Sequence, residues 1–283
     1  MALRSPRAYT ARMDTHDVSD DLLGRRLKAS AVGILSLLLG STAPQEQEWR
    51  PLFNGEDLSG WTVKVTGYDL GEDPLGTFRV EDGLLTVGYE RYDVFGERFA
   101  HLFYDEPFSS YVLRIEYRFI GEQVEGGPDW AVKNSGVMFH SQSPESMARD
   151  QDFPISLEAQ FLGGNGFDDR PTANLCTPGT HVVMEGELIE RHCTSARAPT
   201  YHGEEWVTVD LVVRGGTSIA HVIGGDTVLA YERPVVGGGV VNGYDEAAKH
   251  DGELLTGGYI ALQSESHPVQ FRQVLLRPLA GGR

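Results

Sequence analysis

Positive charge is scarce in this sequence, which has 24 Lys and Arg residues against 41 Asp and Glu residues and a formal net charge of -17 at pH 7. A chain with this charge repels nucleic-acid phosphates and anionic lipid surfaces. The composition therefore predicts no nucleic-acid partner. Neutral ligands, cations and metal ions remain compatible with it.

No hydrophobic run near the N-terminus is long enough to cross a bilayer. The apolar stretch 29–39 has about 11 residues, whereas a membrane-spanning helix needs about 20. It follows the basic stretch Arg25–Lys28 and precedes the small residues 40–43, which is the layout of a secretory signal. We predict that residues 1–45 are an export segment, otherwise disordered. The mature protein would then be periplasmic or secreted, with no membrane span, and the pair Arg25-Arg26 leaves the twin-arginine route open.

Cysteine is nearly absent, since only Cys176 and Cys193 occur. In an oxidising compartment two cysteines most simply form one disulfide, and that is the pairing we predict. The alternative is a metal site, because His181 and His192 lie between them. However, Cys-x4-His…His-Cys is not a usual zinc spacing, and the neighbours His192 and Cys193 would point apart on an extended chain.

Amphipathic helices are lacking after residue 50, where no apolar stripe of helical period and useful length occurs. The dominant period is two: Tyr111–Phe119 alternates apolar side chains with Arg and Glu, which is typical of a strand with one buried face. Turns rich in glycine separate further predicted strands at 206–213, 218–223, 228–231, 258–264 and 269–276.

Linkers and repeats are missing as well. No Pro/Ser-rich tract, acidic run or internal repeat divides the chain after the export segment. We therefore predict one all-β domain, residues 46–283, built as a sandwich of two antiparallel sheets. The stretch 163–201 lacks clear alternation and carries both cysteines, so we expect a long, disulfide-pinned loop or hairpin at one rim.

Several segments resemble the 3-keto-disaccharide hydrolase family in their order and spacing. They are Pro51–Trp61, Phe78–Leu85, Asn134–Phe139, Leu157–Gln160, Glu205–Trp206, Gly258–Gln263 and Val269–Arg272. The resemblance implies a concanavalin A-like jelly roll and a small-molecule saccharide as partner. It also implies cleavage of 3-keto-glycosides by 1,2-elimination and hydration of 3-keto-2-hydroxyglucal.

This chemistry requires one general base, because a ketone at C3 acidifies the proton at C2, and donors or a cation where negative charge develops. A divalent metal ion could serve as the Lewis acid, and no organic cofactor is expected. Glu158 and Gln160 alternate with apolar residues on the predicted strand 155–162 and share its polar face.

A second carboxylate is missing from this strand. Retaining glucanases of this fold carry Glu-x-Asp-x-x-Glu, but the run from Glu158 ends in Gly163. Ordinary glycoside hydrolysis requires two carboxyl groups, so a lone glutamate with other donors favours elimination.

The candidate site residues divide by role. We expect Glu158 and His140 to be catalytic and Glu158 and His181 to hold any metal. The expected substrate-binding residues are Gln160, Gln263, His267, Arg272 and Trp130.

Plainer interpretations compete with several of these roles. His140 and His267 could be solvated histidines at a strand end and in a hairpin, and Arg272 could pair with a strand neighbour. Trp61 and Trp206 are expected in the core. The alternative function is a non-catalytic carbohydrate-binding domain, because lectins commonly have this fold. A structural or partner-binding domain is a third possibility.

Overall fold

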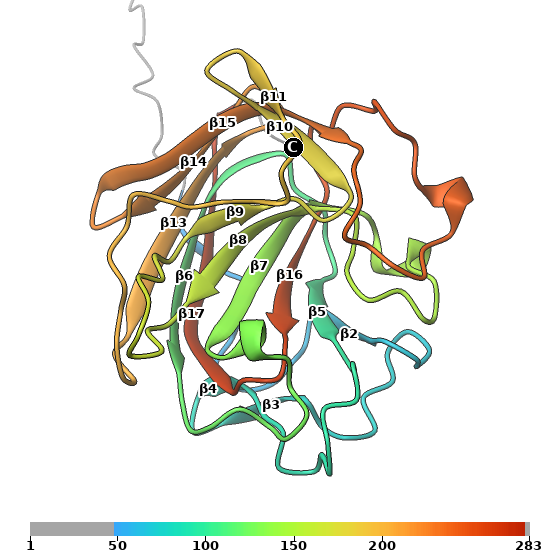
Figure 1. Cartoon of the computed structure of the whole chain (residues 1–283), viewed down its shortest axis with the longest axis vertical. Coiled ribbons are helices and arrows are strands. Elements are labelled where there is room, and N and C mark those ends of the chain that lie inside the picture. The colour runs from blue at the N-terminus through green and yellow to red at the C-terminus, as the bar shows by residue number, and fades with distance from the viewer. Residues whose placement is uncertain (1–47, 281–283) are drawn as a thin grey trace, which may run out of the picture. The chain divides into compact units, whose positions relative to one another are not determined.

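Two antiparallel β-sheets pack against each other in the computed structural model, which describes residues 48–280 (Figure 1). The predicted export segment lies outside the described residues. The all-β jelly-roll sandwich expected from the sequence is confirmed. The described residues 48–280 belong to one compact unit. None of the helices within residues 48–280 is long and apolar enough to span a membrane.

The larger sheet contains ten strands. Its order is β11 (Glu187–Ile189), β10 (Thr180–Met184), β15 (Asp226–Val236), β14 (Ser218–Ile223), β13 (Val207–Arg214), β6 (Ser110–Phe119), β17 (Val269–Pro278), β4 (Leu84–Val87) and β3 (Phe78–Glu81), with β1 (Arg50–Pro51) also paired to β17.

The smaller sheet has seven strands and lies toward the viewer in Figure 1. Its order is β12 (Cys193–Thr194), β9 (Asn174–Cys176), β8 (Leu157–Leu162), β7 (Asn134–Ser141), β16 (Tyr259–Ser264), β5 (Ala100–Tyr104) and β2 (Trp61–Val65). Three short 3₁₀ helices, η1 (Asp129–Ala131), η2 (Pro144–Ser146) and η3 (Glu246–Ala248), lie in the connections.

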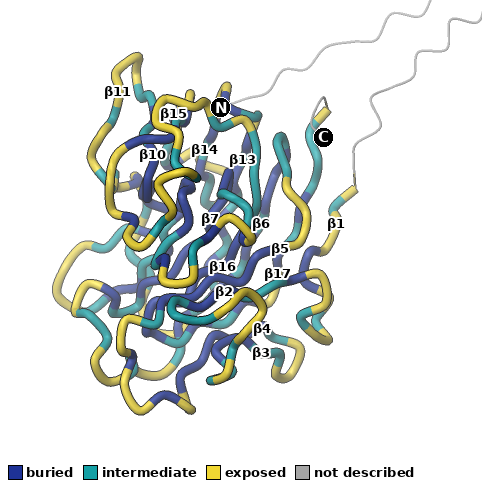
Figure 2. The backbone as a smooth tube through the Cα atoms, turned by 90° about the vertical axis from the view of Figure 1, so that its right-hand side faces the viewer, coloured by how far each residue is buried: buried dark blue, intermediate teal, exposed yellow. Residues whose placement is uncertain are grey.

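The core fills the space between the sheets, and Figure 2 shows buried residues concentrated along the strands. Alternation in β6 turns Tyr117 inward, and alternation in β8 turns Phe161 toward it. Their rings stack across the sandwich with centroids 4.3 Å apart. Because both inner faces are apolar, each sheet is left with one outward face for polar residues.

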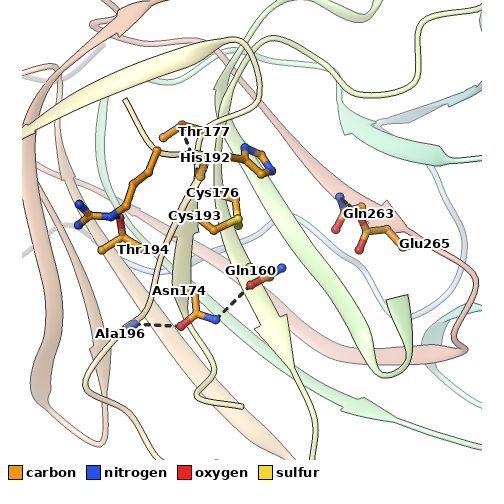
Figure 3. The surroundings of a disulfide bond; sticks show 11 residues. Gln160, Asn174, Cys176, Thr177, His192, Cys193, Thr194, Ala196, Gln263 and Glu265 are labelled. Carbon is orange, nitrogen blue, oxygen red and sulfur yellow. Dashed lines mark hydrogen bonds between the residues drawn. A yellow bond between two sulfur atoms is a disulfide. The ribbon is translucent and has the colours of Figure 1, made fainter. Parts of the chain in front are cut away.

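The stretch 163–201 is more ordered than expected, and its middle joins a different sheet from the segments on either side of it. Strands β9 and β12 extend the smaller sheet, whereas the hairpin of β10 and β11 extends the larger one. These strands have two to five residues each, too few for the alternation to be read from the sequence. The predicted disulfide is confirmed: Cys176 pairs in register with Cys193 and bonds to it (Figure 3).

The two tryptophans expected in the core have different environments. Trp61 is buried, and its indole N–H donates a 2.9 Å hydrogen bond to the Leu52 carbonyl. Trp206 is not in the core. It lies on the outer face of the larger sheet, where the guanidinium groups of Arg118 and Arg272 each lie 4.6 Å from its ring.

Replacing Phe161 with alanine should destabilise the fold by about 3–5 kcal/mol, because its fully buried ring would leave a cavity against Tyr117. Urea unfolding measures the loss. Phe167→Ala is the matched control, because the Phe167 side chain is 92% exposed and should change stability by less than about 0.5 kcal/mol. Equal losses in the two variants would contradict the assigned packing.

Candidate functional site

A cavity of about 1170 Å³ opens on the outward face of the smaller sheet. Glu158 and Gln160 of β8 line it, while Leu157, Ala159 and Phe161 of the same strand face the core, as the alternation predicts. The volume is sufficient for a small saccharide. Besides Glu158, six acidic residues line it, namely Glu97, Asp129, Asp150, Asp152, Asp168 and Glu265, with Arg170 as the only Lys or Arg among the described residues that line it.

A glycine makes room for the Glu158 carboxylate. Gly136 of β7 lies diagonally across from Glu158, since Met138 pairs with Glu158 and Gly136 with Gln160. A Cβ atom on Gly136 would lie 2.6 Å from Glu158 Oε1. Any larger residue at this position would therefore displace the carboxylate, which lies over β7.

Glu265 supplies a second carboxyl group. It directly follows β16 and lines the cavity, and the Nε2 of Gln263 donates a 2.9 Å hydrogen bond to Glu265 Oε1. Continuing the antiparallel register from Leu262 and Val137 puts Gln263 opposite Gly136. Glu158 and Glu265 therefore approach each other across β7.

Burial shifts both carboxyl groups in the same direction. It raises the pKa of Glu158 above its ordinary value. Burial, reinforced by the negative charge of Glu158, raises the pKa of Glu265 well above its ordinary value. Ionising both of two neighbouring buried carboxyl groups costs free energy, because the two negative charges repel each other, so the pair retains a proton at neutral pH. The two groups titrate together, so this proton belongs to the pair.

Four side-chain oxygens at this site lack a hydrogen-bond partner within residues 48–280. They are Glu158 Oε1, Glu265 Oε2, Gln263 Oε1 and Asn134 Oδ1. Glu158, Glu265 and Asn134 line the cavity, and Gln263 is hydrogen-bonded to Glu265. A buried oxygen without a partner costs free energy, so this grouping indicates a ligand that satisfies them. Sugar hydroxyls can donate to such oxygens. Together they also form the oxygen-only donor set that Mg²⁺, Ca²⁺ or Mn²⁺ prefers.

The expected metal pair, Glu158 with His181, is not brought together. His181 lies in β10 of the larger sheet, and its ring packs against Gly237 and Gly238. In the described part of the chain, the one cluster of three His, Cys, Asp or Glu side chains with metal-ligand spacing contains Cys176, His192 and Cys193. Its two sulfur atoms are bonded to each other and are not free to bind a metal.

Two expected substrate-binding residues lie in the cavity wall. Trp130 of η1 is 53% exposed and stacks on Phe99 with ring centroids 6.0 Å apart, so one of its faces is open to a ligand. Gln160 accepts a 3.1 Å hydrogen bond at Oε1 from Asn174 Nδ2. That bond fixes the orientation of the Gln160 amide and leaves its N–H groups available to a ligand.

His140 is not with Glu158, contrary to expectation. Its Nε2 lies 3.1 Å from the Gly215 carbonyl oxygen, in the turn between β13 and β14 of the opposite sheet. The cause is a register shift between β7 and β16, where His140 adopts a φ of 47°. This irregularity breaks the alternation that follows Met138 and turns the imidazole away from the cavity.

His267 and Arg272 are also separate from the cavity lining. Burial, followed by the charges of Lys133 and Arg170, lowers the pKa of His267 to about 4, and its ring lies edge-on to Phe119. Arg272 forms an ion pair with Glu116 on the outer face of the larger sheet. The plainer interpretation of Arg272, pairing with a strand neighbour, is the one the structure supports.

Sequence reasoning missed Glu265, Asn134 and Gly136. The glucanase motif carries both carboxylates on one strand, whereas here the second carboxyl group comes from the residue after β16, which is distant in sequence. A signal for Glu265 was present, because a strand residue two positions after Gln263 shares its face. Nothing in the sequence indicated that Gly136 would border Glu158.

Glu158→Gln and Glu265→Gln should each stabilise the fold at neutral pH. A folded-state pKa above the unfolded value of about 4.3 means that wild-type stability falls as pH rises through that window, by up to about 1.4 kcal/mol per pH unit for each retained proton. Glutamine removes this dependence. Urea unfolding between pH 4 and 8, in EDTA, measures it.

The exposed Glu122→Gln is the matched control and should leave the pH dependence of stability unchanged. A gap between Glu158→Gln and wild type that narrows as pH rises would contradict the raised pKa.

Comparison with known proteins places these features in context. No curated protein sequence matches the chain. Among solved structures, it is similar to a candidate glycosyl hydrolase from Parabacteroides distasonis, with 17% identity, a TM-score of 0.48 and coverage of 82% of this chain and 100% of that one.

It is also similar to a Bacillus subtilis protein of unknown function with a galectin-like fold, with 13% identity, a TM-score of 0.48 and coverage of 82% and 94% of the two chains. For LamAcat from Zobellia galactanivorans the identity is 10%, the TM-score 0.45 and the coverage 82% and 97%. The family model of the 3-keto-alpha-glucoside-1,2-lyase-like domain matches residues 48–277, and the chain therefore belongs to that family.

Proposed function

We propose that this protein is an exported carbohydrate-active enzyme that cleaves 3-keto-glycosides by 1,2-elimination and hydrates the resulting 3-keto-2-hydroxyglucal. The observation that carries the proposal is the pair of buried carboxyl groups, Glu158 and Glu265, in a cavity large enough for a disaccharide. Family membership supports the reaction class. The disulfide and the layout of the N-terminal segment support export to the periplasm or the medium.

In this proposal Glu158 is the general base. Its raised pKa makes the carboxylate basic enough to take a proton from carbon when a neighbouring ketone acidifies that proton. The C2–H bond breaks, the C1=C2 double bond forms, and the C1–O bond breaks with its electron pair on the departing oxygen. Hydration is the corresponding addition: water adds to C1, a proton is added to C2, and the C1=C2 double bond is lost.

Glu265 stabilises the charge that develops on the C3 oxygen. A carboxyl group held neutral by burial donates a hydrogen bond to an enolate, and it does so without reorganisation because the fold fixes its position. Gln263 fixes the orientation of Glu265 through the 2.9 Å hydrogen bond. The amides of Gln160 and Asn134 then remain for the sugar hydroxyls, and Trp130 for one face of a sugar ring.

A divalent cation bound by Glu158, Glu265, Asn134 and Gln263 would supply Lewis-acid polarisation of the ketone. The four unpartnered oxygens within residues 48–280 fit such an ion. Assays with and without chelator therefore belong in the test of the proposal.

Glu158→Gln should lower kcat/KM on a 3-keto-disaccharide by about 10²–10⁴-fold, because glutamine cannot accept the C2 proton. Sugar release by wild type, Glu158→Gln and the control Glu122→Gln is followed by chromatography. Glu122→Gln should retain wild-type activity. The parent disaccharide with a hydroxyl at C3 should not be cleaved, because its C2 proton is not acidified.

Wild-type activity should rise with pH through the raised pKa of Glu158, so its acid limb should lie above the ordinary glutamate value of about 4.3. Cleavage of the parent disaccharide at a comparable rate would instead indicate ordinary hydrolysis by the two carboxyl groups. Binding of saccharides without turnover of any substrate would indicate a carbohydrate-binding domain.

A further inference from the structure

The disulfide forms one wall of the cavity and holds a histidine there. His192 directly precedes Cys193, and both residues line the cavity together with Cys176. A ring nitrogen of His192 lies within 4.8 Å of both sulfur atoms. The main chain at His192 is also fixed, because its carbonyl oxygen accepts hydrogen bonds from Thr177 N at 2.8 Å and Thr177 Oγ1 at 3.1 Å.

The surroundings of the His192 imidazole determine which hydrogen bonds it can make to a ligand. Nδ1 of His192 is buried and has no hydrogen-bond partner in the chain from residue 48 to 280. Nε2 lies on the opposite edge of the ring, and the His192 side chain lines the cavity. Burial lowers the pKa of His192, so the imidazole is neutral near pH 7. With its proton on Nε2, it presents one N–H donor to the cavity.

His192 and Glu265 lie on opposite sides of Glu158. The strand order is β12, β9, β8, β7, β16, with His192 directly before β12, Glu158 on β8 and Glu265 directly after β16. Figure 3 shows His192 and the disulfide on one side of β8 and β7, with Gln263 and Glu265 on the other. Within residues 48–280, β12 is an edge strand and Cys193 is exposed, so this side is the open one.

A sugar ring whose C2 lies at Glu158 has C1 and C3 on opposite sides of that carbon. The C3 ketone is placed beside the deeply buried carboxyl group of Glu265. C1 then points to the open edge, where a departing group can leave. We propose that His192 donates a hydrogen bond from Nε2 to the glycosidic oxygen, and that the Cys176–Cys193 disulfide positions it there. This inference rests on the proposed function.

The step balances without a proton from His192. The C2 proton moves to Glu158, the C1–O bond breaks with its electron pair on the departing oxygen, and this oxygen takes a proton from water at the open edge. The hydroxide left behind is neutralised when Glu158 releases its proton to solvent, which restores the carboxylate. His192 keeps its proton and stabilises the charge on the oxygen as the bond breaks.

The test compares two 3-keto-glucosides whose leaving groups differ in basicity, 4-nitrophenol and methanol. His192→Phe removes the donor but retains a ring of similar shape. It should lower kcat/KM for the methyl glucoside by about 100-fold. The loss for the 4-nitrophenyl glucoside should be less than about threefold, because that leaving group needs little assistance. His192→Gln, which restores an N–H donor, should recover part of the loss.

The disulfide is tested in the same assay with the double variant Cys176→Ala/Cys193→Ala. It should show the same selective loss on the methyl glucoside, mainly in kcat, and adding His192→Phe should cause no further loss. The exposed His250→Gln is the control and should behave as wild type on both substrates.

Equal losses on the two substrates, or no loss in His192→Phe, would overturn the assignment of His192 while leaving the proposed function intact. Selective loss in Glu265→Gln in place of His192→Phe would overturn the assigned direction of the leaving group. Failure of wild type to cleave either 3-keto-glucoside would overturn the proposed function, and the role of His192 with it.

Discussion

The contact between the apolar inner faces of the two sheets is the constraint on which the rest of the structure depends. Phe161 of β8 stacks on Tyr117 of β6 across the sandwich, and Leu157 and Ala159 are buried on the same side of β8. Since successive strand residues point to opposite faces, burying these three side chains forces Glu158 and Gln160 to the other face. The position of the site is thus a consequence of how the core packs.

The site itself works against stability. Two carboxyl groups are buried beside each other, and four side-chain oxygens have no hydrogen-bond partner within the described residues. Burial of this kind is unfavourable and persists where the surrounding sheet fixes it. Gly136 contributes by leaving space for the Glu158 carboxylate. Such a cost is typical of a functional site, where groups are held ready for a ligand at the expense of the free protein.

Two local irregularities decide which histidine reaches the cavity. The register shift between β7 and β16 turns His140 toward Gly215 of the opposite sheet. On the other side of β8, the disulfide holds the start of β12 against β9 and places His192 in the cavity wall. The bulge therefore keeps His140 out of the cavity wall, and the disulfide places His192 in it.

The sequence by itself determined the all-β class, the disulfide and the division of β8 into a core face and a polar face, because period-two alternation and cysteine scarcity are local signals. Only the tertiary structure decided that Glu265, Asn134 and Gly136 surround Glu158, since Asn134 and Gly136 come from β7 and Glu265 directly follows β16, and no local pattern encodes the pairing of these strands with β8. It also decided that His140, His181 and Arg272 lie elsewhere. A bulge, membership of the other sheet and an ion pair with Glu116 place them there, and each depends on contacts between segments distant in sequence.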